Sequence, residues 1–268
     1  MQGPIRNTFK KGITEKNSYL GIINFALILM AWSALAYSGL VSNIFLPTPV
    51  QVIETAYQMI SDPAGDNLLH HAFISTARVA VGFCLSAIIA VPLGMFMGRL
   101  SSVRAFFEPL MGAVRYMPAS AFIPLFILWI GLGEAEKITV IFWGTFFQQT
   151  LMVMDVAKNV SGELVEVSYT LGAKQLNTFK KVILPASLPG IIDTLRISFG
   201  WAWTYLIVAE LVGANSGLGY VIIQAGRFLH TDVIFVGILV IGLLGMFTDL
   251  FFKILYRVMF PWLTKEGT

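Results

Sequence analysis

Five polar or amphipathic side chains fall inside long apolar stretches of the sequence. They are Arg115, Gln148, Gln149, Trp203 and Glu210. Groups that ionise or form hydrogen bonds are costly in hydrocarbon, so in a membrane they commonly mark a solute pathway. Arg115 stands just before Pro118, which removes a backbone donor and favours a helix break. A charge beside such a break indicates either a solute path or an arginine held by backbone carbonyls for packing alone.

Other residue types exclude several kinds of chemistry. Cys84 is the only cysteine, which excludes an internal disulfide and a cysteine-rich metal site; we expect it to be a small buried apolar residue. We expect His70, His71 and His230 in outer loops, away from the acid–base cluster that an intramembrane enzyme requires. The chain contains no Gly-Lys pair and therefore no P-loop, so any ATP hydrolysis must come from another polypeptide.

Composition indicates that lipid is the solvent for much of the chain. Of the 268 residues, 56% are hydrophobic and 12% charged, and the mean hydropathy is +0.76. Soluble domains are about 45–50% apolar and about 25% charged. A soluble fold of this length would not bury so much apolar surface.

Six stretches meet or approach the length of about 20 apolar residues that crosses a bilayer as a helix. They are 19–40, 73–98, 106–131, 138–157, 191–212 and 233–255. The sequence therefore predicts an all-α, polytopic membrane protein. The expected order is a cytoplasmic segment (1–18), a first transmembrane helix (19–40), an extracytoplasmic segment (41–72), a transmembrane core (73–257) with a large loop (158–189), and a cytoplasmic tail (258–268).

The connecting segments alternate in charge. Segment 41–72 carries acidic residues and no lysine or arginine, whereas segment 1–18 and loop 158–189 are rich in lysine. Basic residues favour the cytoplasmic side, so six spans with both termini inside are expected. A rival reading takes Ala34-Leu35-Ala36 as the cleavage site of a signal peptide, but the apolar run is long and continues past Ala36.

The second stretch has small residues at every fourth position, which places them on one helical face. They are Gly82, Ser86, Ala90, Gly94 and Gly98. A smooth face lets another helix approach closely, so the pattern predicts a tightly packed central helix. Pro92, Pro118 and Pro124 each favour a kink or break in the stretch that contains them.

Three shorter helices are expected outside the bilayer. After Thr48 as N-cap and Pro49 in the first turn, apolar residues recur at helical spacing, which predicts a short amphipathic helix on the outer surface. In loop 158–189 we expect a helix over about 162–171, ended by Gly172, and a second over about 174–184 that stops at Pro185. An amphipathic helix in such a loop either lies on the membrane surface or inserts into a partner.

The loop also carries a motif. Glu166, Val167, Ser168 and Gly172, followed after nine residues by Val182-Ile183-Leu184-Pro185, resemble the "EAA" loop of ABC importer permeases. Val167 and Ser168 replace the two alanines of that pattern. Further runs, including 46–49, 115–118, 128–134, 209–211 and 216–220, resemble the nitrate/sulfonate/taurine branch of these permeases, although Tyr116 and Ala119 stand where prolines are usual.

The resemblance implies a fold, partners and residue roles. The fold is a type I (MetI-like) importer core in the bacterial cytoplasmic (inner) membrane. The partners are a second copy of the chain, two ATP-binding cassette subunits that hold ATP and Mg²⁺, an external substrate-binding protein and the lipid bilayer, with no nucleic acid and no cofactor in this chain. The coupling residues implied are Glu166, Val167, Ser168, Leu171, Gly172, Leu184 and Pro185, and the translocation path would be lined by the five polar residues named first.

The function implied is a permease subunit that passes a small anion such as a sulfonate, taurine or nitrate. The alternative is a secondary transporter or channel that is not driven by ATP. Such folds often contain inverted repeats. We find no repeat in this sequence, and a coupling loop would have no role there.

Overall fold

The computed structural model describes residues 5–61 and 67–264, with side chains from residue 19 to 263. The first four residues of the predicted N-terminal segment, Asp62 and Asp66 of the outer segment, and Lys265 of the tail lie outside the described residues. All regular structure in the described part is helical, as predicted. Five helices are long and apolar enough to cross a membrane, or six crossings if one bent pair forms a single span.

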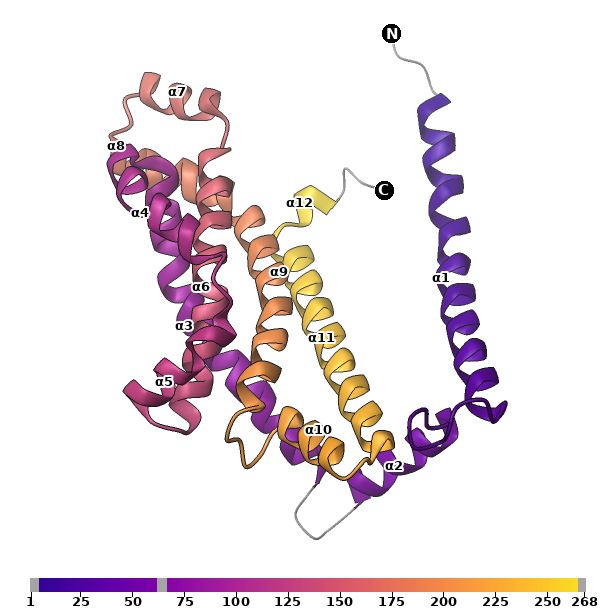
Figure 1. The fold of residues 1–268 in the computed structure, drawn as a ribbon. Coiled ribbons are helices and arrows are strands. Elements are labelled where there is room, and N and C mark those ends of the chain that lie inside the picture. The colour runs from indigo at the N-terminus through magenta and orange to yellow at the C-terminus, as the bar shows by residue number, and fades with distance from the viewer. Residues whose placement is uncertain (1–4, 62–66, 265–268) are drawn as a thin grey trace.

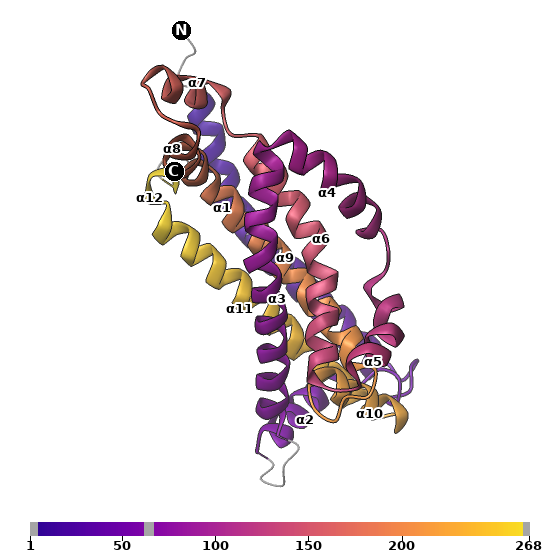
Figure 2. The same cartoon turned by 90° about the vertical axis from the view of Figure 1, so that its left-hand side faces the viewer.

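A central group of helices forms the core of the bundle. α3 (Leu68–Arg99) packs along α6 (Glu134–Lys158), and α6 packs against α9 (Leu184–Glu210) (Figure 2). α11 (Thr231–Met259) covers α9 and ends before the short α12 (Pro261–Thr264). α1 (Ile5–Tyr37) stands apart from this group over most of its length (Figure 1), and its apolar residues from Tyr19 to Tyr37 are mostly exposed.

The close approach of α3 and α6 follows from the small-residue face. A Cβ atom at Gly94 would lie 2.6 Å from the Thr150 carbonyl oxygen, and one at Gly98 would lie 2.6 Å from the Ala157 Cβ. Gly82 meets Ile141 in the same way. The prediction of a tightly packed face is therefore confirmed. The glycines meet residues of α6 in the same chain order, which shows that the two helices run parallel.

The third predicted span is broken. α4 (Ser101–Val114) is followed by a 3-10 turn (Ala119–Phe122) and α5 (Ile123–Ile130), and the two halves are bent by 88°. Pro118 lacks an N–H and disfavours helix at the residue before it, which explains the position of the break. Pro124 lies in the first turn of α5, where proline is tolerated, and so does not break that helix. α3 continues through Pro92 without interruption.

Short helices lie at the two ends of the bundle. α2 (Pro49–Ser61) and α10 (Leu218–Arg227) lie at one end, and α7 (Gly162–Thr170) and α8 (Gln175–Thr178) at the other (Figure 1). The predicted N-cap of α2 is confirmed, because the Gln51 N–H donates to Thr48 Oγ1 over 3.2 Å. The start of α1 and the end of α12 lie at the α7 end, as six crossings require.

Three local predictions are wrong. The second loop helix does not stop at Pro185, because a π-helical turn (Phe179–Ile183) leads directly into α9. Pro185 lies in the first turn of α9, where its missing N–H is tolerated. His70 and His71 belong to α3 rather than to a loop, and His71 is buried because it turns toward α10. Cys84 is exposed, since it lies on the face of α3 opposite the glycines.

Candidate functional site

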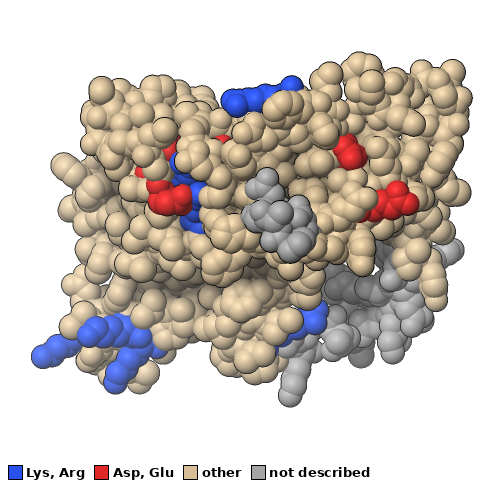
Figure 3. Space-filling model, turned by 90° about the horizontal axis from the view of Figure 1, so that it is seen from below, with Lys and Arg blue, Asp and Glu red and all other residues tan. Residues whose placement is uncertain are grey.

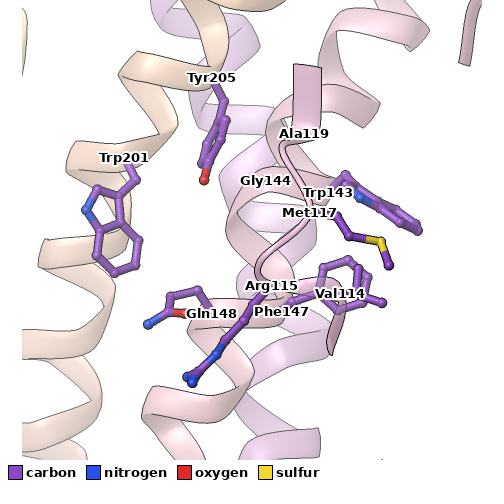
Figure 4. Close-up of a pocket in the computed structure, with 10 residues that line it drawn as sticks. All are labelled: Val114, Arg115, Met117, Ala119, Trp143, Gly144, Phe147, Gln148, Trp201 and Tyr205. Carbon is purple, nitrogen blue, oxygen red and sulfur yellow. The ribbon is translucent and has the colours of Figure 1, made fainter. Parts of the chain in front are cut away.

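A cavity of about 230 Å³ lies between the break in the third span and the middle of α6 and α9. Its lining residues are Val114, Arg115, Met117, Ala119, Trp143, Gly144, Phe147, Gln148, Trp201 and Tyr205. In Figure 4 the Arg115 and Gln148 side chains lie below the Trp201 and Tyr205 rings, which project from α9. The cavity thus combines a guanidinium and an amide with aromatic walls.

The helix break places Arg115 in this cavity. α4 ends at Val114, and Arg115 is the last residue in helical conformation before the chain turns toward Pro118. Its Nη2 donates to the Tyr116 hydroxyl over 2.8 Å, and its guanidinium lies 4.8 Å from the centre of the Tyr116 ring. No carboxylate of the described residues forms an ion pair with it. Its positive charge is therefore available to an anion.

Gly144 determines how closely the two walls approach. A Cβ atom at this position would lie 2.5 Å from Cγ of Tyr205. Because Gly144 has no side chain, the Tyr205 ring lies against the α6 backbone and forms part of the cavity wall (Figure 4).

The other three predicted path residues lie away from this cavity. Gln149 is buried between α6 and α3, where its Oε1 accepts from Ser86 Oγ over 2.6 Å. Trp203 is buried in the hydrophobic cluster that contains Phe83 and Phe252. Glu210 is buried at the end of α9 that carries α10. The structure thus brings Arg115 and Gln148 together in the cavity. The side chains of Gln149, Trp203 and Glu210 instead pack inside the protein.

Glu210 belongs to an ion-pair network centred on Arg78, in which Arg78 and Glu210 are buried and Glu134 is 62% exposed. Arg78 Nη1 lies 2.7 Å from Glu210 Oε1, and Arg78 Nε donates to Glu134 Oε2 over 2.6 Å. A second guanidinium nitrogen also pairs with Glu134. Arg78 is 3% exposed and lies one helical turn before Gly82, on the small-residue face of α3.

Backbone N–H groups in the first turn of α10 complete this network. The Gly219 N–H donates to Glu210 Oε2 over 2.7 Å, and the Leu218 N–H donates to Ser75 Oγ over 2.8 Å. Gly217 has a φ of +110° and lies so close to Glu210 that no Cβ would fit. The network therefore ties α3, α6, α9 and α10 at one end of the bundle. Seen from that end, adjacent acidic and basic side chains interrupt a mostly uncharged face (Figure 3).

The opposite end carries the motif residues of the large loop. α7 ends in a Schellman motif: Gly172 has a φ of +80°, its N–H donates to the Tyr169 carbonyl, and the Ala173 N–H donates to the Ser168 carbonyl. Ser168 is buried, and its hydroxyl lies 3.0 Å from Thr178 Oγ1, which holds α7 against α8. Gly172 and Ser168 therefore shape this segment.

The outer face of α7 has no cover within the described chain. Val167 and Leu171 are 57% and 82% exposed, and Leu164 on the same face is also exposed. The Glu166 carboxylate is exposed and forms no hydrogen bond or ion pair with any described residue. Pro185 is exposed and Leu184 packs against the cluster around Val153. α7 therefore presents an apolar face to the exterior, and the exposed carboxylates of Glu163 and Glu166 lie on the helix surface outside that face.

Comparison with known proteins identifies the family. Residues 90–264 match the family described as binding-protein-dependent transport system inner membrane component. The chain is 36% identical to the putative aliphatic sulfonates transport permease protein SsuC of Bacillus subtilis, an alignment that covers 90% of this chain and 87% of the relative. It is 34% identical to the taurine transport system permease protein TauC of Escherichia coli, over 91% and 89% of the two chains.

One further relative and one solved structure agree with this assignment. The nitrate import permease protein NrtB of Synechocystis is 29% identical over 89% of this chain and 88% of its own. A chain of the inward-facing MetNI methionine ABC transporter superposes with a TM-score of 0.67 at 21% identity, covering 74% of this chain and 98% of that one. The fold is thus the MetI-like core that was predicted. The chain belongs to the family of binding-protein-dependent inner-membrane components and is the multi-pass permease component of an ABC importer, in which ATP hydrolysis is the task of a separate subunit.

Proposed function

We propose that two copies of this chain form the membrane path for a small organic anion of the sulfonate class. Two ATP-binding cassette subunits dock on α7, and an external binding protein delivers the solute at the end that carries α2 and α10. ATP and Mg²⁺ are held by the cassette subunits, and this chain carries no cofactor. The observation that carries the proposal is the exposed apolar face of α7, shaped by Gly172 and left without a cover in a chain of this family.

The proposed orientation puts α7 and both termini in the cytoplasm. The basic loop 158–189 and the basic segment 1–18 support it. Reporter fusions at Asp62 and Lys174 are expected to fall on opposite sides of the membrane, with Lys174 inside. Fusions on the same side would contradict the orientation.

The cavity at the helix break supports an anionic solute. A guanidinium without a carboxylate partner favours an anion, and the aromatic side chains of Trp201 and Tyr205 favour an organic group beside it. The cavity is smaller than the roughly 300–1,000 Å³ of drug-sized ligand sites, which suits a small solute. Relatives named for aliphatic sulfonates and taurine support the same class.

Uptake by the complete transporter tests this proposal. Arg115→Gln is expected to lower uptake of a labelled short alkanesulfonate about tenfold, because a hydrogen bond to a charged group contributes roughly 1.5–3 kcal/mol. Arg115→Lys is expected to retain part of the activity. Arg257→Gln, an exposed arginine far from the cavity, is the control. Unchanged uptake by Arg115→Gln, or no sulfonate uptake by the parent transporter, would contradict the proposal.

A further inference from the structure

A second cavity, of about 410 Å³, lies where the last turn of α3 meets the loop segment α7–α8. Phe96 and Arg99 of α3 form one wall, Tyr169 of α7 another, and Leu176 and Phe179 a third. The Phe96 and Phe179 rings stack with centroids 5.7 Å apart and planes within 7°. The cavity is therefore mainly apolar and is bounded jointly by a membrane span and the segment that we assign to coupling.

Arg99 is the charged group of this cavity, and the chain leaves it unsatisfied. Its Nε is buried and has no hydrogen-bond partner, and its Nη2 donates only to the Val160 carbonyl at 3.5 Å. Among the described residues no carboxylate pairs with it, whereas Arg78 and Arg196 each have carboxylate partners. A buried guanidinium nitrogen without a partner requires an explanation, and an anion from outside the chain supplies one.

The position of the cavity defines the kind of anion. Arg99 is the last residue of a 32-residue span, so the cavity lies at the level where α3 leaves the hydrocarbon. Phe96 is 46% exposed and Leu176 is 63% exposed, so apolar side chains border the mouth of the cavity. A free phosphate would satisfy Arg99 and leave these walls bare. A molecule with a negative head and a hydrocarbon chain would satisfy both.

We propose that this cavity binds one anionic phospholipid of the leaflet that contains α7. The phosphate accepts hydrogen bonds from the Arg99 guanidinium, and an acyl chain lies along Phe96, Phe179 and Leu176. Exposed lysines of the same end, Lys174 and Lys180, attract anionic lipid to this surface. Because the walls belong to both α3 and the α7–α8 segment, the lipid braces the coupling segment against the span. The depth of the cavity in the membrane rests on the proposed orientation.

The test counts lipids on the complete transporter. The complex is purified in nanodiscs of phosphatidylglycerol and phosphatidylcholine, released in the gas phase, and its retained phosphatidylglycerol is counted by native mass spectrometry. The parent is expected to retain one molecule per permease chain. Arg99→Gln is expected to retain at most one fifth of that, and Arg99→Lys most of it. Arg104→Gln, an arginine of neighbouring α4 that does not line the cavity, is the matched control.

A second variant and a soluble probe make the test decisive. Leu176→Ser changes an exposed side chain, so folding is preserved, and it is expected to reduce lipid retention by weakening the apolar wall. Equal retention by the parent and Arg99→Gln would overturn the proposal. Displacement of the lipid by millimolar glycerol phosphate or inorganic phosphate would also overturn it in favour of a free-phosphate site. Because lipid is counted without transport, either result leaves the permease function unaffected.

Discussion

The two ends of the bundle differ in how their arginine and glutamate side chains are paired. At the α10 end, Arg78 and Glu210 are buried, and side chains and backbone N–H groups of the same chain complete their hydrogen bonds. At the α7 end, Glu166 forms no ion pair and Arg99 has no carboxylate partner among the described residues. The Arg78 network is thus satisfied within the chain, whereas Glu166 and Arg99 are available to other molecules.

If α7 is the docking surface proposed above, this difference indicates where a cassette subunit acts on the permease. A network that ties α3, α6, α9 and α10 makes one end a rigid unit. α7 contacts the rest of the chain mainly through the Ser168–Thr178 pair and the π-helical turn. It can therefore bind a partner without disrupting the packing of the central helices. Because this turn continues into α9, a displacement of the segment is transmitted directly to a span.

The largest effect is expected at the hinge of the α7 end. Gly172→Pro cannot adopt a φ of +80°, because proline is restricted to about −65°. Uptake should fall below a tenth of the parent value while membrane insertion is unchanged. Gly162→Pro is the matched control, since proline is tolerated at the first position of a helix. Normal uptake by Gly172→Pro would show that the shape of this segment is not needed for transport.

A charge reversal tests the same end without changing the backbone. Glu166→Arg keeps an exposed, helix-compatible side chain and inverts one of the two exposed charges of α7, which are Glu163 and Glu166. Transport is expected to be abolished because the cassette subunit meets a like charge, with membrane insertion intact. Glu163→Arg, in the first turn of the same helix, serves as the control and should retain more uptake. Equal uptake by both variants and the parent would argue against a charged anchor at position 166.

The ion-pair network at the α10 end is tested by removing the charge of Arg78. Arg78→Met leaves Glu210 buried without its partner, which is expected to cost about 3–5 kcal/mol of unfolding free energy. Arg196→Met breaks a partly exposed pair with Asp249 but leaves Asp249 paired with Lys253, so a loss of at most about 1 kcal/mol is expected. Thermal unfolding in detergent compares the two variants. Similar losses for both would remove the distinction between a structural network and a surface pair.

The smallest effect is expected at the packing face between the two ends. Gly94→Ala inserts a Cβ 2.6 Å from a backbone oxygen of α6, so overpacking should cost about 1–3 kcal/mol. Gly242→Ala in α11 meets nothing within 4 Å and is expected to change the unfolding free energy by no more than about 0.5 kcal/mol. A stable Gly94→Ala protein would mean that α3 and α6 separate easily.

The sequence predicted features that depend on local spacing. The spans, the packing face of α3, the break at Pro118 and the end of α7 at Gly172 follow from periodicity and from proline and glycine stereochemistry. The sequence did not show which of two nearby polar or aromatic side chains points into the cavity. Gln148 lines the cavity while Gln149 binds Ser86, and Trp201 lines it while Trp203 enters the core. These directions depend on the contacts of α6 with α3 and α9, which no single segment contains.

Contact between α7 and the cassette subunit tests the central claim most directly. A photo-crosslinking amino acid at Val167, which is 57% exposed, is compared in native membranes with one at Ile53 of α2, which is 69% exposed. The account predicts a crosslink to the cassette subunit from position 167 and none from position 53. No crosslink from position 167, or an equal one from position 53, would contradict it.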